Sequence, residues 1–362
     1  MSPRIVIVGS TGKLGSKLLT YTNKNNIKIF AITCFSNKKK ILNQGQKYNI
    51  KNTFTLSDPS EQNVFFSLLK SKLNIIYFLD YGSKSLSYLN IFLKFNSNSI
   101  IAIANKEMII AGGKLLQSNI NKSNNTLVPL DSEHFSLKNL NFRNHNIYKV
   151  YITASGGPFY FNKKIDINNV SNKEVLSHPK WNMGFNNLID SSNFINKILE
   201  IFELSYIYDI ELKKIDFYVS KEAYLHSIVR FTDSTVTFNG FNNNMLIPLA
   251  YPLSLFYPVK VVDRSIKYLT TSNLELEKPY DKRFVFFKYY KKIKLLNHKE
   301  QINLMLLNNH AHKLYLSNKL KYNKIISYIM SNVSIGVDNK PFNSFAEVEK
   351  YIVKFNKKLK TK

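Results

Sequence analysis

The segment VPLDSEH, residues 128–134, places two carboxylates and an imidazole directly after an apolar run. Acidic residues are scarce in this chain, which has 24 Asp plus Glu against 51 Lys plus Arg. We expect extended chain here, in which Asp131 and Glu133 point to the same side because successive side chains alternate. Carboxylate oxygens are the ligands that Mg²⁺ and Mn²⁺ prefer. The segment is therefore a candidate metal site.

A second acidic cluster lies on a predicted helix. Asn196 and Glu200 are four residues apart, and Glu203 is one turn beyond Glu200, so the three share a helix face. Glu200 would complete a set of hard oxygen ligands that leaves positions open for substrate and water. An ordinary surface charge is the alternative for any one carboxylate, but two such clusters in an acid-poor chain favour a metal.

A glycine-rich turn follows the first apolar run of the chain. Gly9, Gly12 and Gly15 come after RIVIV, residues 4–8, and open a stretch with helical spacing. Glycine permits a tight turn and lets backbone N–H groups approach a phosphate at the helix N-terminus. Such turns also serve packing alone, but the strand–turn–helix context favours dinucleotide binding.

The end of the second predicted strand bears on the choice of dinucleotide. An NAD site usually has an acidic residue there, which bonds the ribose 2′-hydroxyl. Residues 33–37, TCFSN, contain no acid and lead into three lysines at 38–40. A hydroxyl, an amide and cations suit a 2′-phosphate, so the sequence favours NADPH over NADH. The alternative is that residues 38–40 are a solvated charge run.

Other polar residues stand where ligands commonly bind. The apolar run 101–104 ends in Asn105, Lys106 and Glu107, and a lysine at a strand end can stabilise developing negative charge. The turn ASGGP, residues 154–158, offers a hydroxyl and backbone N–H groups to a phosphate. Ser191, Asn196 and Lys197 are candidate donors to the same phosphate.

The segment SHPKWNMG, residues 177–184, contains the only tryptophan of the chain, Trp181. Its turn-forming residues predict a loop, and an exposed aromatic there is typical of a lid that closes over substrate and excludes water. The alternative is a tryptophan that anchors a loop to the core.

The order of apolar runs predicts an α/β fold. Runs of strand length at 28–33, 75–80 and 99–105 alternate with helical stretches such as 61–73. This alternation predicts an N-terminal Rossmann-like, doubly wound parallel sheet. A second strand-rich region begins at 126–130 and 148–157.

The rest of the chain predicts further parts. A helix at 191–208 and strands at 215–220 and 234–240 complete a central α+β catalytic domain, and helical periodicity from about 291 indicates a small helical domain. The predicted division is an NADPH-binding domain at 1–127, the catalytic domain at 128–258, a linker at 259–290 and the helical domain at 291–362.

The composition of the chain bears on its cellular compartment and on its binding partners. The net charge of +27 allows a polyanion-binding surface, but the lysines are spread along the whole chain, which favours compositional drift, and we do not expect nucleic acid as the partner. A single cysteine, Cys34, suits a reducing cytoplasm. No apolar run reaches the roughly 18 residues that a membrane span needs. The N-terminus enters a strand at once, so we expect no signal peptide and a cytoplasmic protein without membrane contact.

Taken in order, these motifs resemble the 1-deoxy-D-xylulose 5-phosphate reductoisomerase family. The resemblance is carried by GSTGKLG (9–15), ANKE (104–107), LDSEH (130–134), ASGGPF (154–159), HPKWNMG (178–184), IDSSNFINKILEIFE (189–203) and LHSIVRF (225–231). It implies a homodimeric enzyme that uses NADPH and a divalent metal, Mg²⁺ or Mn²⁺. The implied reaction rearranges 1-deoxy-D-xylulose 5-phosphate and reduces it to 2-C-methyl-D-erythritol 4-phosphate, in the non-mevalonate isoprenoid pathway.

The resemblance also implies roles for individual residues. The catalytic set is Lys106, Glu133 and His178. The metal ligands are Asp131, Glu133 and Glu200. The cofactor set is Gly9, Ser10, Thr11, Gly12, Lys13, Leu14, Ser36, Asn37, Asn105, Glu107 and Gly184. The substrate set is Lys106, Ser132, Glu133, Ser155, His178, Trp181, Ser191, Asn196, Lys197 and Glu200.

Two other functions stay open at this point. The first is a decayed relative of this family that acts as a basic nucleic-acid-binding protein. The net charge of +27 suggests this function. The second is an NADPH oxidoreductase that acts on a different sugar phosphate.

Overall fold

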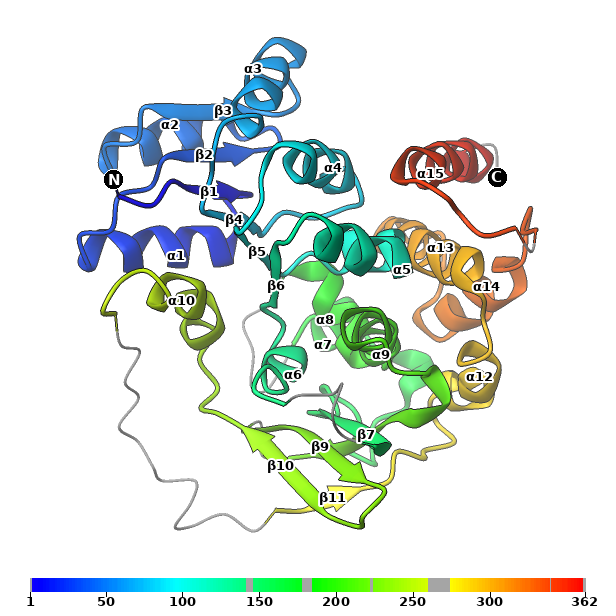
Figure 1. Ribbon diagram of the computed structural model, residues 1–362. Helices are drawn as coiled ribbons and strands as arrows, with labels where there is room; N and C mark the ends of the chain where they lie inside the picture. Colours follow the sequence, from blue (N-terminus) through cyan, green and yellow to red (C-terminus); the bar gives the residue numbers. More distant parts are fainter. Residues whose placement is uncertain are drawn as a thin grey trace. The chain divides into compact units, whose positions relative to one another are not determined.

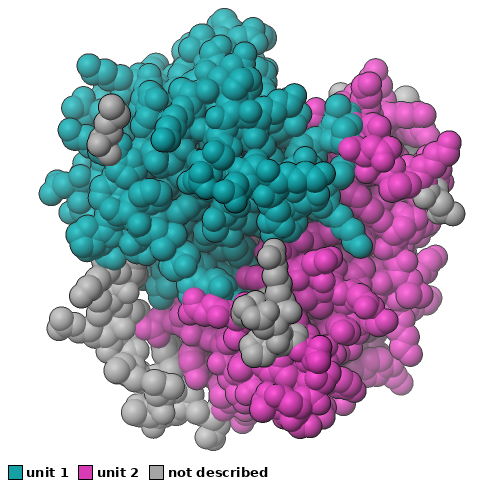
Figure 2. Space-filling model, viewed as in Figure 1, with its two compact units in different colours: residues 1–138, 244–264, 344–346 teal, residues 139–243, 265–343, 347–362 magenta. Residues whose placement is uncertain are grey.

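The computed structural model describes residues 2–140, 146–177, 184–221, 224–259, 274–338 and 340–360. Two compact units make up the chain, and Figure 2 colours them separately. Unit 1 comprises Met1–Lys138, Asn244–Arg264 and Ser344–Ala346. Unit 2 comprises Asn139–Asn243, Ser265–Asn343 and Glu347–Lys362.

Unit 1 is built on a six-stranded parallel sheet, sheet A, with the strand order β3-β2-β1-β4-β5-β6. Its strands are β1 (Ile5–Val8), β2 (Ala31–Cys34), β3 (Asn52–Thr55), β4 (Ile75–Phe78), β5 (Ile100–Ile103) and β6 (Thr126–Pro129). Every residue of β1, β2, β4 and β5 is buried, as in parallel strands covered on both faces. The order is that of a dinucleotide-binding Rossmann sheet, which confirms the predicted fold class.

The helices of unit 1 cover both faces of sheet A. They are α1 (Lys13–Lys24), α2 (Lys38–Lys47), α3 (Pro59–Leu69), α4 (Ser85–Phe95), α5 (Lys106–Lys122), α6 (Ser132–Phe135) and α10 (Leu246–Ser254). In Figure 1, α1 and α10 lie on one face of the sheet and α4 on the other. Leu249 and Leu253 bring α10 into the same buried cluster as Leu18 and Leu19 of α1, although more than half the chain separates the two helices.

Unit 2 contains a mixed sheet, sheet B, with the order β10-β9-β7-β8-β11. Its strands are β7 (Ile147–Ala154), β8 (Ile215–Ser220), β9 (Leu225–Phe231), β10 (Val236–Gly240) and β11 (Leu276–Glu277). Only β7 and β8 pair in parallel among these described strands, so the chain between them must cross over the sheet. That crossover contains η1 (Ile167–Asn169), α7 (Asn172–Val175), α8 (Phe185–Ser192), α9 (Ile195–Tyr208) and η2 (Leu212–Lys214).

A helical segment follows sheet B in the sequence. It comprises α12 (Val285–Ile293), α13 (His298–Leu316), η3 (Tyr322–Lys324), α14 (Ile325–Asn332) and α15 (Phe345–Lys360). Asn297 and Glu300 form a capping box that begins α13, since each side chain accepts from the other's backbone N–H. The helical periodicity read from the sequence is confirmed by these elements.

Several element predictions need correction. Residues 126–130 do not open the second strand-rich region, because β6 pairs in parallel with β5 and completes sheet A. The helix expected at 191–208 is interrupted, because Phe194 adopts the left-handed conformation with φ of 70° and separates α8 from α9. β3, whose sequence NTFT has three polar residues out of four, was not predicted.

The predicted linker at 259–290 contains secondary structure. β11 and the start of α12 lie within it, and residues 260–273 lie outside the described part of the chain. The functional division at 1–127, 128–258, 259–290 and 291–362 stays a prediction. None of the helices in the described ranges has the length and apolar character that a membrane-spanning helix needs.

The Tyr77→Phe substitution tests how α10 is held on sheet A. The hydroxyl of fully buried Tyr77 donates to the carbonyl of Leu249 at 2.9 Å. Its loss leaves a buried carbonyl without this donor, so we expect the free energy of unfolding to fall by about 1–3 kcal/mol in urea denaturation. The control is Tyr280→Phe, because Tyr280 is 68% exposed. Equal stabilities of the two variants would contradict this role.

Candidate active site

The glycine-rich turn of unit 1 is tightly packed. Gly9 has φ of 88°, and an added Cβ would lie 2.5 Å from the backbone nitrogen of Asp80. An added Cβ at Gly15 would lie 2.5 Å from the carbonyl oxygen of Gly9. Glycine is therefore required at both positions for the turn to close against β4 and α1. The first turn of α1, which begins at Lys13, contains no acidic residue that would repel a phosphate.

Side chains of α2 fasten this turn. The buried hydroxyl of Ser10 donates to Oε1 of Gln44 at 2.8 Å, and Nζ of Lys40 donates to the carbonyl of Thr11 at 2.7 Å. Asn37 begins α2, because its Oδ1 accepts from the N–H of Lys40 at 3.1 Å. The predicted cofactor residues at 9–14, 36 and 37 thus gather at the carboxyl ends of β1 and β2.

Asn105 joins the carboxyl ends of β4 and β5. Its Nδ2 donates to Oδ1 of Asp80 at 3.1 Å and to the carbonyl of Gly82 at 2.9 Å. Its Oδ1 accepts from the N–H of Met108 at 2.9 Å and so begins α5. Burial raises the pKa of the Asp80 carboxyl, and the hydrogen bonds from Ser85 and Asn105 oppose that rise. The predicted cofactor residue Glu107 is buried in the first turn of α5.

Lys106 and Asp131 form an ion pair at the carboxyl ends of β5 and β6. The distance from Nζ to Oδ2 is 2.6 Å, and the two side chains are 13% and 18% exposed. Asp131 caps α6, because its carboxylate accepts from the N–H of Glu133 at 3.3 Å. The expected extended chain after residue 131 is therefore wrong, since this cap starts a helical turn. The hydroxyl of Ser132 donates to the Glu133 carboxylate, so all four residues gather in unit 1.

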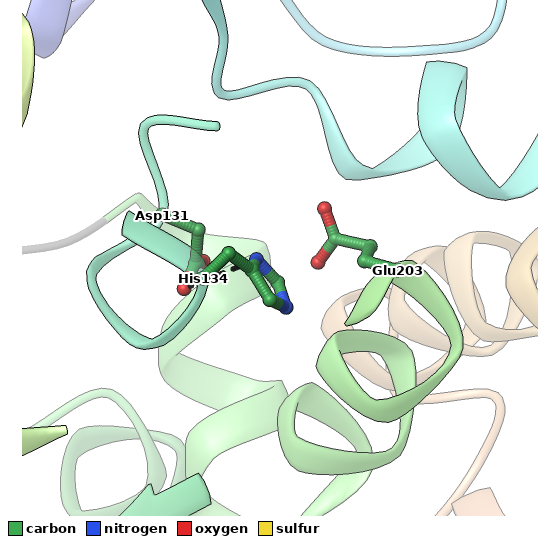
Figure 3. A group of neighbouring side chains, drawn as sticks. All are labelled: Asp131, His134 and Glu203. Carbon is green, nitrogen blue, oxygen red and sulfur yellow. Dashed lines mark ion pairs between the residues drawn. The ribbon is translucent and has the colours of Figure 1, made fainter. Parts of the chain in front are cut away.

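His134 also belongs to this group and was not among the predicted site residues. Its ring is fully buried, and its Nδ1 lies 3.8 Å from Oδ1 of Asp131. Figure 3 draws this pair with its dashed line, together with Glu203, which α9 of unit 2 carries. His134 could have been noticed in the sequence, because it ends the DSEH stretch. The sequence alone, however, does not show whether its ring is buried or exposed.

In unit 2, a turn of two glycines follows β7. Gly156 and Gly157 have φ of 79° and 60°, both in the left-handed region. An added Cβ at Gly157 would lie 2.6 Å from the carbonyl oxygen of Ser191, the second-last residue of α8. The turn that begins at Ser155 therefore packs directly against the end of α8, and two predicted phosphate-binding segments come together.

The first turns of α9 carry buried charged side chains. Lys197 is 4% exposed and Glu200 is 2% exposed. The Lys197 ammonium pairs with the Glu200 carboxylate and donates to the carbonyl of Thr153 at the end of β7. Asn196 donates from Nδ2 to the same carboxylate. Three predicted substrate residues, one of them also a predicted metal ligand, are thus linked within unit 2.

Arg283 fastens the segment that follows the glycine turn. Its guanidinium donates to four backbone carbonyls within residues 159–165 and pairs with Asp281. Burial raises the pKa of Asp281, but hydrogen bonds from Arg283 and Lys163 outweigh it and bring the pKa to about 2. This role of Arg283 was not predicted from the sequence, although arginine occurs at only five positions of the chain.

The other three predicted site residues are His178, Trp181 and Gly184. His178 and Trp181 lie outside the described residues. Gly184 is the N-cap of α8 in unit 2.

Sequence comparisons identify the relatives of this chain. The family model described as the 1-deoxy-D-xylulose 5-phosphate reductoisomerase C-terminal domain matches residues 127–208. The reductoisomerase of Pelagibacter ubique is 33% identical over 371 residues, which cover 96% of this chain and 94% of the relative. That of Thermoanaerobacter pseudethanolicus is 30% identical over 305 residues, which cover 76% of this chain and 77% of the relative. The chain belongs to the 1-deoxy-D-xylulose 5-phosphate reductoisomerase family.

Solved structures of reductoisomerases share the fold. The Zymomonas mobilis enzyme in complex with NADPH superimposes with a TM-score of 0.84 at 20% identity and covers 99% of this chain and 98% of its own. A reductoisomerase in complex with NADPH, fosmidomycin and magnesium gives 0.85 at 22% identity, with 99% and 97% covered. The family assignment and the fold therefore agree.

The Gly157→Ala substitution tests the contact between the glycine turn and α8. The left-handed conformation alone costs an L-residue about 1–2 kcal/mol, and the approach to Ser191 adds to that cost. The control is Gly336→Ala in the same unit, with φ of 68°, where an added Cβ meets only the flexible end of Lys358. We expect the larger loss of unfolding free energy for Gly157→Ala in urea denaturation. Equal losses would mean that the turn does not need its close packing.

Proposed function

We propose that this protein is an NADPH- and metal-dependent 1-deoxy-D-xylulose 5-phosphate reductoisomerase that forms 2-C-methyl-D-erythritol 4-phosphate. The observation that carries the proposal is the ion pair of Lys106 with Asp131, beside Glu133, at the ligand-binding edge of a Rossmann sheet in a chain of this family. The carboxyl ends of parallel strands are where such sheets bind ligands.

NADPH fits the carboxyl edge of sheet A. The glycine turn leaves the start of α1 open to a phosphate, and the end of β2 has hydroxyl, amide and cationic side chains in place of an acid. The proposed cofactor set is residues 9–14 with Ser36, Asn37, Asn105, Glu107 and Gly184. NADPH supplies the hydride, and two solved relatives of the same fold were determined with it.

A divalent cation fits the carboxylates. Asp131, Glu133 and Glu200 each offer a carboxylate oxygen, the donor type that Mg²⁺ and Mn²⁺ prefer. When bound, such a cation supplies Lewis-acid polarisation of the substrate carbonyl. Three solved reductoisomerase structures were determined with magnesium, which supports Mg²⁺, and we keep Mn²⁺ as an alternative.

The chain's own side chains bind and orient the sugar phosphate. Ser155, Ser191, Asn196 and Lys197 hold its phosphate, and Lys106, Ser132 and Glu133 contact the part that reacts. The Lys106 ammonium, held by Asp131 at 2.6 Å, stabilises negative charge that develops on substrate oxygens. His178 and Trp181 complete the proposed set as residues that cover the substrate and exclude water.

The oligomeric state and the cellular location of the enzyme are also part of the proposed function. We propose a homodimer, as the family resemblance implies. We also propose a cytoplasmic location, which the single buried cysteine supports because it suits a reducing compartment.

The absorbance of NADPH tests the proposed activity directly. Purified protein is mixed with 1-deoxy-D-xylulose 5-phosphate and NADPH, with Mg²⁺ or Mn²⁺ and then with a chelator, and the product is identified by NMR. We expect metal-dependent loss of NADPH and formation of the branched phosphate. Folded protein that consumes no NADPH would contradict the proposal, and salt-sensitive binding to nucleic acid would then be measured for the binding-protein alternative.

The Glu133→Gln substitution tests the metal assignment. An amide is a weaker ligand for a hard cation than a carboxylate, and metal polarisation contributes several kcal/mol, so we expect kcat to fall at least about a hundredfold. The control is Glu211→Gln, which removes an exposed carboxylate that pairs with Lys213. Near-normal rates of Glu133→Gln at ordinary metal concentrations would show that Glu133 is not a ligand.

A further inference from the structure

α8 carries a buried carboxylate next to a residue of the proposed phosphate site. Asp190 is 5% exposed and directly precedes Ser191, which is half-buried. Burying a carboxylate is costly unless hydrogen bonds compensate it. The partners of Asp190 therefore decide how this end of α8 is held.

Two side chains of α13 provide that compensation. Nδ2 of Asn308 donates to Oδ1 of Asp190 at 2.7 Å, and Nε2 of His312 lies 2.9 Å from the same oxygen. Asn308 and His312 are each 1% exposed.

The same imidazole contacts α8 at a second point. Nδ1 of His312 lies 3.3 Å from Oδ1 of Asn186, which is four residues before Asp190 and on the same helix face. One rigid ring that meets two positions a turn apart fixes both the rotation of α8 about its axis and its position along that axis.

The residue after Ser191 is tied as well. The hydroxyl of Tyr322 donates to Oγ of Ser192 at 2.9 Å, and Ser192 is fully buried. Both chain neighbours of Ser191 are thus bonded to the helical segment that follows sheet B. Ser191 itself stays half-buried, with its carbonyl against the glycine turn at Gly157.

We propose that His312 is a positioning residue for the substrate phosphate. It holds Asp190 and Asn186, and through α8 it fixes the direction in which Ser191 presents its hydroxyl. This inference rests on the proposed function, which puts Ser191 in the phosphate site. Packing of α8 on α13 would not require such a pair, because apolar side chains of similar size hold a buried interface at least as well. Two polar contacts from one ring instead select a single orientation of the helix.

The His312→Leu variant tests this role in the full-length enzyme. A binding group displaced by a fraction of an ångström weakens substrate binding, so we expect KM for 1-deoxy-D-xylulose 5-phosphate to rise about tenfold. Inhibition by inorganic phosphate should weaken by the same factor, while kcat changes little. The dissociation constant of NADPH, measured by fluorescence, should stay at the wild-type value.

Two further variants separate positioning from stability. His312→Gln keeps a side-chain N–H that can donate to Asp190, so it should restore most of the phosphate affinity. His310→Leu is the matched control, because His310 lies on the same helix but contacts the hydroxyl of Tyr328 at 2.7 Å. It should lower Tm without changing KM or inhibition by phosphate.

The outcomes distinguish this inference from the proposed function. If His312→Leu lowers Tm but leaves KM and inhibition by phosphate unchanged, His312 is only structural and the inference is overturned. If the wild-type enzyme neither turns over the sugar phosphate nor responds to inorganic phosphate, the proposed function fails and removes the basis of the inference.

Discussion

The need to compensate buried charge governs how unit 2 is built. Three ionisable side chains on α9, those of Lys197, Glu200 and Glu203, are each at most 4% exposed. Taking such a charge out of water costs several kcal/mol unless partners restore the lost interactions. Lys197 and Glu200 pair with each other, and Lys197 also reaches the end of β7. The same requirement applies to Asp190 on α8, the helix before α9, because its partners are side chains of α13. A helix that served only to support the fold would not need these buried charges, whose desolvation lowers the free energy of unfolding.

A strained backbone conformation puts these charges where they lie. Phe194, between α8 and α9, adopts the left-handed conformation, which costs about 1–3 kcal/mol for a residue other than glycine. Ring contacts offset that cost, because its side chain packs among aromatic rings from three other parts of unit 2, Tyr160, Phe217, Phe284, Phe286 and Phe287. The turn at Phe194 lets α8 end at Ser192, directly after Ser191, while α9 begins a new axis that carries Asn196 and Lys197.

Local patterns were sufficient to predict four of the six strands of sheet A, but β3 was missed and β6 was assigned to the second strand-rich region. β1 is a continuous run of β-branched residues, and the glycines that follow it, Gly9 and Gly15 among them, mark a tight turn. Contacts between distant segments were not predictable. The break at Phe194 depends on rings up to 93 residues away, and Asn308 meets Asp190 across 118 residues. The short helix after Asp131 was missed because a cap and an extended strand end use the same residues.

We propose that Asp131, Glu133 and Glu200 bind a divalent cation. Binding of Mn²⁺ measured by electron paramagnetic resonance, as the loss of the free-ion signal on titration, tests that claim without any substrate or turnover. The claim predicts one site per chain in the wild-type protein and greatly weakened binding in Glu200→Gln, measured at a temperature at which circular dichroism shows that the variant is folded. Wild-type affinity and stoichiometry in Glu200→Gln would contradict the claim, because a buried carboxylate that can be neutralised without effect on the ion is not a ligand.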